Sequence, residues 1–145
     1  MLVHATTVAI GGRGVLIRGA PGSGKSDLAL RMIDAGARLV ADDQTEVARE
    51  GKALVARAPK TIAGKLEVRG LGIVAVKAVR KVRLALAVDL VAEGAEERMP
   101  EPAWIELLGL RLPLVRLAGF RASAPAKLRL ALVSLAHKKA IIRSS

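Results

Sequence analysis

The chain has 145 residues, with 24 Lys and Arg against 13 Asp and Glu, which gives a net charge of +11. This length is typical of one domain with one substantial core. The chain contains one Trp, one Phe and no Tyr, so its core must be aliphatic. The same scarcity argues against a nucleic-acid module that stacks bases on aromatic rings.

Cysteine and long apolar runs are both missing. Without cysteine, disulfides and thiolate metal sites are excluded. No apolar run reaches the roughly 18 residues of a membrane span, and the start lacks a signal-peptide pattern. We therefore expect a cytoplasmic protein with no membrane partner.

The positive charge has three readings: a basic proteome, attraction to an acidic protein, or non-specific binding to nucleic acid. The basic residues are spread along the chain and form no single tract. This distribution favours a protein partner over a specific nucleic acid.

The chain begins with two expected strands, residues 2–10 and 15–17, joined by a glycine-rich turn at residues 11–14. His4 lies in the first of them. Pairing of the two strands could bring His4 near the loop that follows residue 17, although a histidine near a chain end is more often an ordinary surface residue.

The segment after the second strand fits the pattern G-x-x-x-x-G-K-[ST] of phosphate-binding loops. Glycines let the backbone amides turn toward a phosphate, Lys25 reaches the β- and γ-phosphates, and the Ser26 hydroxyl can bind Mg²⁺. Residues 27–34 then have helical spacing, with Gly36 as a natural C-cap. The sequence therefore predicts a nucleotide-binding loop, for ATP and Mg²⁺, made of Gly19, Ala20, Pro21, Gly22, Ser23, Gly24, Lys25 and Ser26.

A short apolar strand at residues 37–41 ends in Asp42 and Asp43. At the carboxyl end of a strand beside the loop's own strand, one carboxylate can hold Mg²⁺ while the other takes a proton from an attacking hydroxyl. The alternative is a solvated Asp-Asp turn.

Residues 45–49 and 53–58 read as a hairpin, and residues 59–64 as a loop. The string Leu-Glu-Val-Arg-Gly-Leu-Gly at 66–72 then places Glu67 and Arg69 on one face. Such a pair could supply a metal ligand and a charge clamp beside a triphosphate. It could equally be a surface ion pair.

The rest of the chain completes an α/β pattern. Residues 82–90 are a strongly apolar strand, residues 91–102 a charged loop with Arg98, and residues 104–117 a strand or two around Pro113. Ser123 caps a last helix, with His137 in its final turn as a structural residue. We expect one domain over residues 1–145: a P-loop-containing mixed sheet with a phosphate-loop helix and a C-terminal helix.

Together these motifs resemble the catalytic domain of HPr kinase/phosphorylase, the bacterial enzyme that phosphorylates a serine of the phosphocarrier protein HPr. The likeness rests on His4, residues 19–26, residues 39–43 and above all residues 66–73, and it spans roughly residues 2–117. The short, single-domain form resembles the versions found in α-proteobacteria.

The resemblance implies a role for each matching residue. Residues 19–26 and Arg69 would bind ATP, and Ser26 and Glu67 would ligate Mg²⁺. Asp43 would be the general base, His4 would orient the Asp42–Asp43 corner, and Arg98 would match an arginine that the family places after its long strand. The implied activity is that of an ATP- and Mg²⁺-dependent protein serine kinase. A small-molecule kinase and a nucleotide-dependent regulatory ATPase are the alternatives.

One family feature is not recognisable here. Residues 117–123 stand where longer members carry a Gly-Arg-Asn loop, which is associated with the reverse phosphorylase reaction and with subunit contacts. We therefore expect weak or absent dephosphorylation of the partner, and looser contacts in any homo-oligomer.

Overall fold

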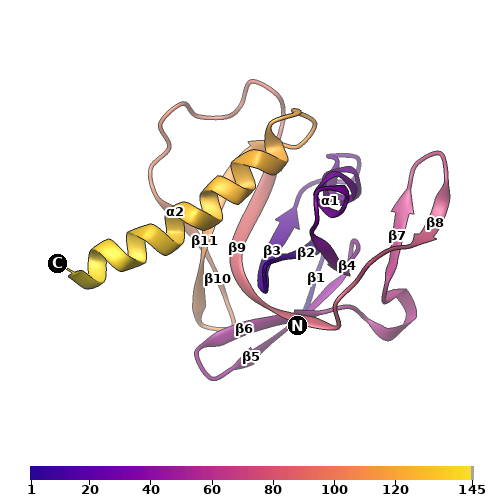
Figure 1. Cartoon of the computed structure of the whole chain (residues 1–145), viewed down its shortest axis with the longest axis horizontal. Helices are drawn as coiled ribbons and strands as arrows, with labels where there is room; N and C mark the ends of the chain where they lie inside the picture. The colour runs from indigo at the N-terminus through magenta and orange to yellow at the C-terminus, as the bar shows by residue number, and fades with distance from the viewer. Residues whose placement is uncertain (145) are drawn as a thin grey trace.

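The computed structural model describes the backbone of residues 1–144 and the side chains of residues 1–135. It contains a nine-stranded sheet, a separate two-stranded hairpin and two α-helices. The hairpin stands apart from the main sheet, and the C-terminal helix crosses the other end of the molecule (Figure 1). The elements are β1 (Leu2–Val3), β2 (Thr6–Ile10), β3 (Arg13–Arg18), α1 (Lys25–Asp34), β4 (Arg38–Ala41), β5 (Thr45–Glu50), β6 (Ala53–Arg57), η1 (Lys60–Ile62), β7 (Lys65–Val68), β8 (Gly72–Ala75), β9 (Lys81–Val91), β10 (Ala103–Leu107), β11 (Leu110–Ala118) and α2 (Ala124–Ser144).

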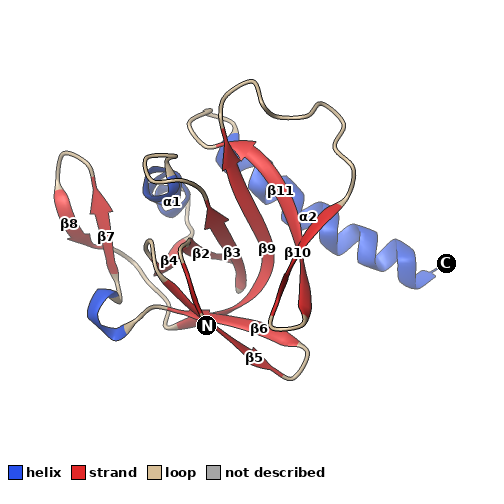
Figure 2. Cartoon of the chain, turned by 180° about the vertical axis from the view of Figure 1, so that it is seen from behind, coloured by secondary structure: helices blue, strands red, loops and turns tan. Residues whose placement is uncertain are grey.

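Strand β9 organises the sheet. One of its edges pairs in parallel with β3, while the other pairs first with β6 and then, from Ala87 onward, in parallel with β11. This change of partner along one strand lets the β10–β11 hairpin follow β6 along the same edge of β9, and its turn reaches the β5–β6 hairpin, where Arg49 donates to the carbonyl oxygen of Leu108 at 3.1 Å (Figure 2). The result is a mixed α/β sheet with two helices, as predicted, and the sheet is curled (Figure 2).

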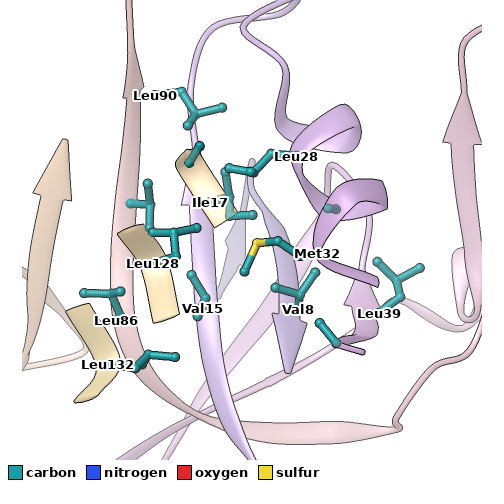
Figure 3. Packing of buried hydrophobic residues seen from close by; sticks show 14 of the residues in the cluster. Val8, Val15, Ile17, Leu28, Met32, Leu39, Leu86, Leu90, Leu128 and Leu132 are labelled. Atoms are coloured by element: carbon teal, nitrogen blue, oxygen red, sulfur yellow. The ribbon is translucent and has the colours of Figure 1, made fainter. Parts of the chain in front are cut away.

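The core is aliphatic and lies on both faces of the sheet. On one face, Val15, Ile17, Leu86 and Val88 pack against α1 and α2 (Figure 3). Leu16 and Ala87 alternate with them and point to the other face, where the β5–β6 and β10–β11 hairpins cover them. Because neighbouring side chains on a strand point to opposite faces, two-sided burial explains why β3 and β9 are apolar runs rather than alternating patterns.

Helix α1 is amphipathic, and its buried residues include Leu28, Ala29 and Met32. It ends in a Schellman motif, in which the amides of Gly36 and Ala37 bond to the carbonyls of Ile33 and Met32. Gly36 has φ 107°, a left-handed conformation that favours glycine. The predicted helix and its glycine C-cap are therefore confirmed, as is the predicted hairpin of β5 and β6.

One strand prediction needs correction, and another is made more precise. The expected strand at residues 2–10 is broken at His4 and Ala5, because β1 pairs with β5 while β2 pairs with β3 and β4. Residues 104–117 contain two strands, one of the predicted alternatives: β10 and β11 pair as a hairpin that turns at Leu108 and Gly109. Pro113 lies inside β11, where pairing with β9 begins only one residue later, so that edge requires no N–H from the proline.

Helix α2, the predicted C-terminal helix, packs Ala124, Leu128 and Leu132 into the core. The sequence predicts that His137 lies in the last turn of this helix, but the helix continues to Ser144. The proposed structural role of the His137 side chain lies outside the described residues. No helix in the described part of the chain is long and apolar enough to cross a membrane.

Candidate active site at the carboxyl edge of the sheet

The loops that carry the predicted site residues meet at one edge of the sheet. Strands β3, β9 and β11 are parallel, so their carboxyl ends lie together. We expected β4 to lie beside β3, but β2 lies between them. Since β2 is antiparallel to both, β4 still points the same way as β3 and delivers Asp42 to the same edge. Open α/β sheets bind ligands at such an edge.

The glycine loop (residues 19–26) leaves β3 and enters α1. Gly22 and Gly24 have φ 80° and 100°, conformations that turn successive amides toward one side of the loop. A Cβ atom at Gly19 would collide with Ser23 Oγ. That hydroxyl is buried and, among the described residues, has no hydrogen-bond partner. A tightly curled loop with an unsatisfied polar atom fits an anion such as a phosphate group.

Lys25 is the first residue of α1, and only 9% of it is exposed. Its Nζ atom donates to the carbonyl oxygens of Gly19 at 2.9 Å and of Ala20 at 3.3 Å. The ammonium group is therefore folded back over the loop, at the side from which a phosphate would enter.

Asp42 is the centre of a buried polar cluster and is itself only 9% exposed. Its Oδ1 atom accepts hydrogen bonds from Ser26 Oγ at 2.7 Å and from Thr6 Oγ1 at 3.2 Å. Its Oδ2 atom accepts one from the backbone amide of Glu67 at 3.0 Å. One carboxylate thus links the glycine loop, β2 and β7.

Thr6 is a site residue that sequence reasoning missed. It is fully buried, donates to Asp42 and accepts the Asp43 amide at 3.0 Å. The available signal was a pair of threonines, Thr6 and Thr7, inside an otherwise apolar strand. A buried hydroxyl needs a partner, but the sequence does not say which carboxylate supplies it.

Asp43 points away from its neighbour. It has φ 62°, the left-handed region that asparagine and aspartate enter more readily than other side chains. This conformation, just beyond the end of β4, leaves Asp43 exposed beside the buried Asp42. The two carboxylates are therefore divided into one held inside the cluster and one presented to solvent.

The β7–β8 hairpin carries Glu67 and Arg69, both exposed. Arg69 lies in the turn, after β7 has ended at Val68, so the predicted shared strand face is not formed. Among the described residues the two side chains make no ion pair with each other. The contact that reaches the site is the backbone amide of Glu67 on Asp42.

His4 and Arg98 are also exposed. His4 lies between β1 and β2, next to the Asp42–Asp43 corner in the strand pairing, since Val3 pairs with Thr45. Arg98 lies in the loop of residues 92–102. Within the described side chains neither forms a hydrogen bond or ion pair with Asp42, Asp43 or the glycine loop.

The loop of residues 119–123, after β11, closes the other flank of the glycine loop. Arg31 of α1 donates to the carbonyl oxygens of Gly119 and Arg121. Arg121 pairs with Glu96 at 2.7 Å, and Lys127 pairs with the same carboxylate at 3.3 Å.

Glu96 is only 15% exposed. Burial is the largest influence on its pKa and raises it. The backbone of Ala118 and the charges of Lys127 and Arg121 outweigh burial and leave the pKa below its ordinary value. The ionised form of Glu96 therefore fastens the 92–102 loop to the 119–123 loop.

Comparisons with known proteins relate the whole chain to one family. Residues 1–101 match the model of the HPr serine kinase C-terminal domain. The HPr kinase/phosphorylase of Cupriavidus metallidurans is 38% identical over 126 residues, 79% of this chain and 39% of that protein. The HPr kinase/phosphorylase of Chlorobium phaeobacteroides is 38% identical over 130 residues, 81% of this chain and 40% of that protein.

A solved structure described as the HPr(Ser) kinase/phosphatase from Coxiella burnetii superposes with a TM-score of 0.83 at 25% identity, covering 99% of this chain and 94% of the solved chain. The chain spans about two fifths of the length of the curated relatives. The family resemblance inferred from residues 19–26, 39–43 and 66–73 is confirmed: the chain belongs to the family of the HPr serine kinase C-terminal domain.

Proposed function

We propose that this protein is an ATP- and Mg²⁺-dependent protein serine kinase whose substrate is an HPr-like phosphocarrier protein. The observation that carries the proposal is the Asp42 cluster. It joins the serine of a glycine loop to a buried carboxylate at 2.7 Å and leaves a second carboxylate, Asp43, exposed beside it. A nucleotide-dependent switch requires the serine–carboxylate pair of Ser26 and Asp42. It does not require a second, exposed carboxylate that can accept a proton from a substrate hydroxyl.

The residues present fit a nucleotide with its metal. Curled amides, the buried Ser23 hydroxyl and the Lys25 ammonium group suit the phosphates. Ser26 and Asp42 offer adjacent hard oxygen atoms, the pair with which phosphate-loop enzymes hold Mg²⁺. Glu67 is a further candidate ligand, since its backbone already contacts Asp42. When bound, the metal would neutralise charge on the phosphate oxygens.

Asp43 is the proposed general base. A serine hydroxyl of the partner attacks the γ-phosphate in line, the bond from the γ-phosphorus to the bridging oxygen breaks, ADP leaves with that oxygen, and Asp43 takes the serine proton. Lys25 and the loop amides hold the charge that spreads over the transferred group. Thr6 keeps the base in place by accepting the Asp43 amide, and no covalent intermediate on the enzyme is required.

Three further residues remain candidates for this site. His4 lies close enough in the strand pairing to orient Asp43. Arg69 and Arg98 are exposed cations on loops at the periphery of the site, and they would contact the nucleotide or the partner once these are bound. A net charge of +11 favours an acidic protein partner. We infer a cytoplasmic location, since the proposed reaction uses ATP.

The decisive test is phosphorylation of a panel of HPr-like phosphocarriers with labelled ATP and Mg²⁺, read out as phosphoserine by mass spectrometry. Variants of each carrier that lack the acceptor serine are the controls. Serine-specific labelling that Asp43→Asn slows about 10²- to 10⁴-fold is the expected result. ATP hydrolysis without labelling of any carrier would favour the regulatory ATPase, and labelling of small molecules alone would favour a metabolite kinase.

A further inference from the structure

A nucleotide held by the glycine loop must place its base somewhere along the same edge of the sheet. The parallel strands next to β3 are β9 and then β11, so the loops after them are the natural neighbours of the sugar and base. The loop of residues 119–123 touches the glycine loop directly. A methyl group added at Gly119 would lie 3.3 Å from the Ser23 carbonyl oxygen.

Phe120 lies against the glycine loop at Gly24. A methyl group added at Gly24 would lie 2.9 Å from the ring atom Cζ of Phe120 and 3.0 Å from Cε1. The ring is nevertheless 66% exposed. One edge of it therefore rests on the phosphate-binding backbone, while most of its surface remains free to contact another flat group.

The backbone on both sides of Phe120 is fixed. Arg31 donates to the carbonyl oxygens of Gly119 and Arg121, the residues that flank the ring. A methyl group added at Gly119 would lie 2.9 Å from a methyl carbon of Leu90. The loop therefore has no room to move closer to β9. The Phe120 ring thus projects from an anchored loop, not from a free one.

No other aromatic ring of this chain can take that position. Phe120 and Trp104 are the aromatic residues of the sequence. Trp104 lies on β10 opposite Pro113, in the first half of β11, and the Arg111 guanidinium covers its ring at 4.6 Å. The aromatic surface next to the glycine loop is therefore that of Phe120.

We propose that Phe120 is the stacking platform for the base of the nucleotide whose phosphates bind the glycine loop. This inference rests on the proposed nucleotide-dependent function and adds the residue that recognises the base. Stacking on an aromatic face is tolerant of base identity, so Phe120 gives affinity for the nucleoside part more than selection among bases.

The test compares two ligands that share phosphates and differ in the base: ATP and inorganic tripolyphosphate, each titrated by calorimetry with Mg²⁺. Base stacking predicts that Phe120→Ala weakens ATP binding about 5- to 100-fold and leaves tripolyphosphate binding unchanged. Phe120→Trp should keep the wild-type ATP affinity. Trp104→Ala, which removes the other exposed aromatic ring, should change neither ligand.

Other outcomes overturn the proposal. If Phe120→Ala weakens both ligands equally, the ring only supports the loop at Gly24; if it leaves ATP binding intact, the base lies elsewhere. Should Phe120→Ala not fold, Phe120→Leu carries the comparison, because it keeps apolar bulk and removes the aromatic face. If the wild-type protein binds tripolyphosphate as tightly as ATP, the proposed base site is contradicted, but the proposed nucleotide-dependent function is not. Binding of neither ligand contradicts the proposed function as well.

Discussion

The two flanks of the glycine loop are built from different chemistry. On the Asp42 flank, Ser26, Thr6 and the Glu67 amide converge on one buried carboxylate. On the flank of residues 119–123, the attachments are the partly exposed side chains of Arg31, Arg121 and Glu96. Buried polar networks are costly to rearrange, whereas exposed ion pairs contribute little and are screened by salt.

This difference separates two tasks. The Asp42 flank is preorganised and suits the transfer step, which requires fixed groups around the transferred phosphate. The other flank is anchored by side chains that are more exposed than the Asp42 cluster, and it suits affinity for the nucleoside part. Substitutions on the first flank should therefore reduce the rate of transfer, and substitutions on the second should change binding or local stability.

The largest expected effect is that of Lys25→Ala. Its ammonium group is the proposed partner of the transferred phosphate, and losing one such cation costs roughly 10³-fold or more in rate. We expect phosphate transfer to fall to background in the labelled-carrier assay, while circular dichroism shows a folded chain. The matched control is Lys52→Ala, an exposed lysine in the β5–β6 turn, which should keep full activity. Full activity in Lys25→Ala would contradict the nucleotide site.

Asp43→Asn is expected to have the next largest effect. The amide keeps the size of the side chain but cannot accept the proton, and loss of a general base typically lowers the rate about 10²- to 10⁴-fold. We expect kcat to fall within this range, with ATP affinity little changed. Because the Asp43 side chain is exposed, the Tm should also stay near that of the wild type.

Asp42→Asn provides the contrast. One of its two acceptor oxygens becomes an NH₂ group, which must face a hydroxyl or the Glu67 amide. A buried donor left without a partner costs about 1–3 kcal/mol, so this variant should show a lower Tm as well as lower activity. If Asp43→Asn instead lost stability while Asp42→Asn did not, the assignment of buried and exposed carboxylates would be reversed.

Much of this arrangement follows from local sequence. The pattern of residues 19–26 fixes the glycine loop, and apolar spacing with Gly36 fixes α1, since both depend on neighbours within a few residues. The Asp42 cluster depends on sheet topology. Its position requires β2 to lie antiparallel between β3 and β4, a pairing that periodicity does not encode.

The missed features have the same origin. Thr6 meets Asp42 across 36 positions of sequence, and Phe120 meets Gly24 only because β11 pairs with β9. Arg69 was misplaced for a local reason: the hairpin turn begins one residue earlier than expected, since the amide of Leu71 bonds to the carbonyl oxygen of Val68. Residue identity therefore predicted which side chains gather at this edge of the sheet, and long-range pairing decided which of them meet.

A smaller effect is expected from Glu96→Gln, which weakens the attachment of the 119–123 loop. The folded chain holds the pKa of Glu96 below its ordinary value of 4.5. Its ionised form therefore stabilises the fold above that pH, and the contribution is lost as the pH falls through the folded pKa. We expect Glu96→Gln to lower the Tm by a few degrees at pH 7.

The pH series is the check on that expectation. The Tm difference between wild type and Glu96→Gln should shrink below about pH 4.5 and disappear once Glu96 is protonated in both states. Glu97→Gln, a neighbouring exposed carboxylate, serves as the control and should show no such difference. A Tm difference that is constant with pH would mean that the Glu96 charge does not hold the loop.

The smallest expected signal is the reverse reaction, in which inorganic phosphate attacks phosphoserine and releases pyrophosphate. It needs a second cationic pocket near the phosphoserine, and Arg98 and Arg121 are the candidates that the sequence offers. Arg121 is already engaged by Glu96 at 2.7 Å, which leaves less positive charge for an incoming phosphate. We expect phosphoserine loss at millimolar phosphate, without ATP, to be far slower than the forward reaction. Glu96→Gln removes the closer of the two carboxylates that pair with Arg121, the other being Glu93 at 3.7 Å. This variant should therefore raise that rate, whereas Glu97→Gln should not. Rapid pyrophosphate release by the wild type would show that the paired Arg121 still serves the phosphate, or that Arg98 supplies the pocket alone.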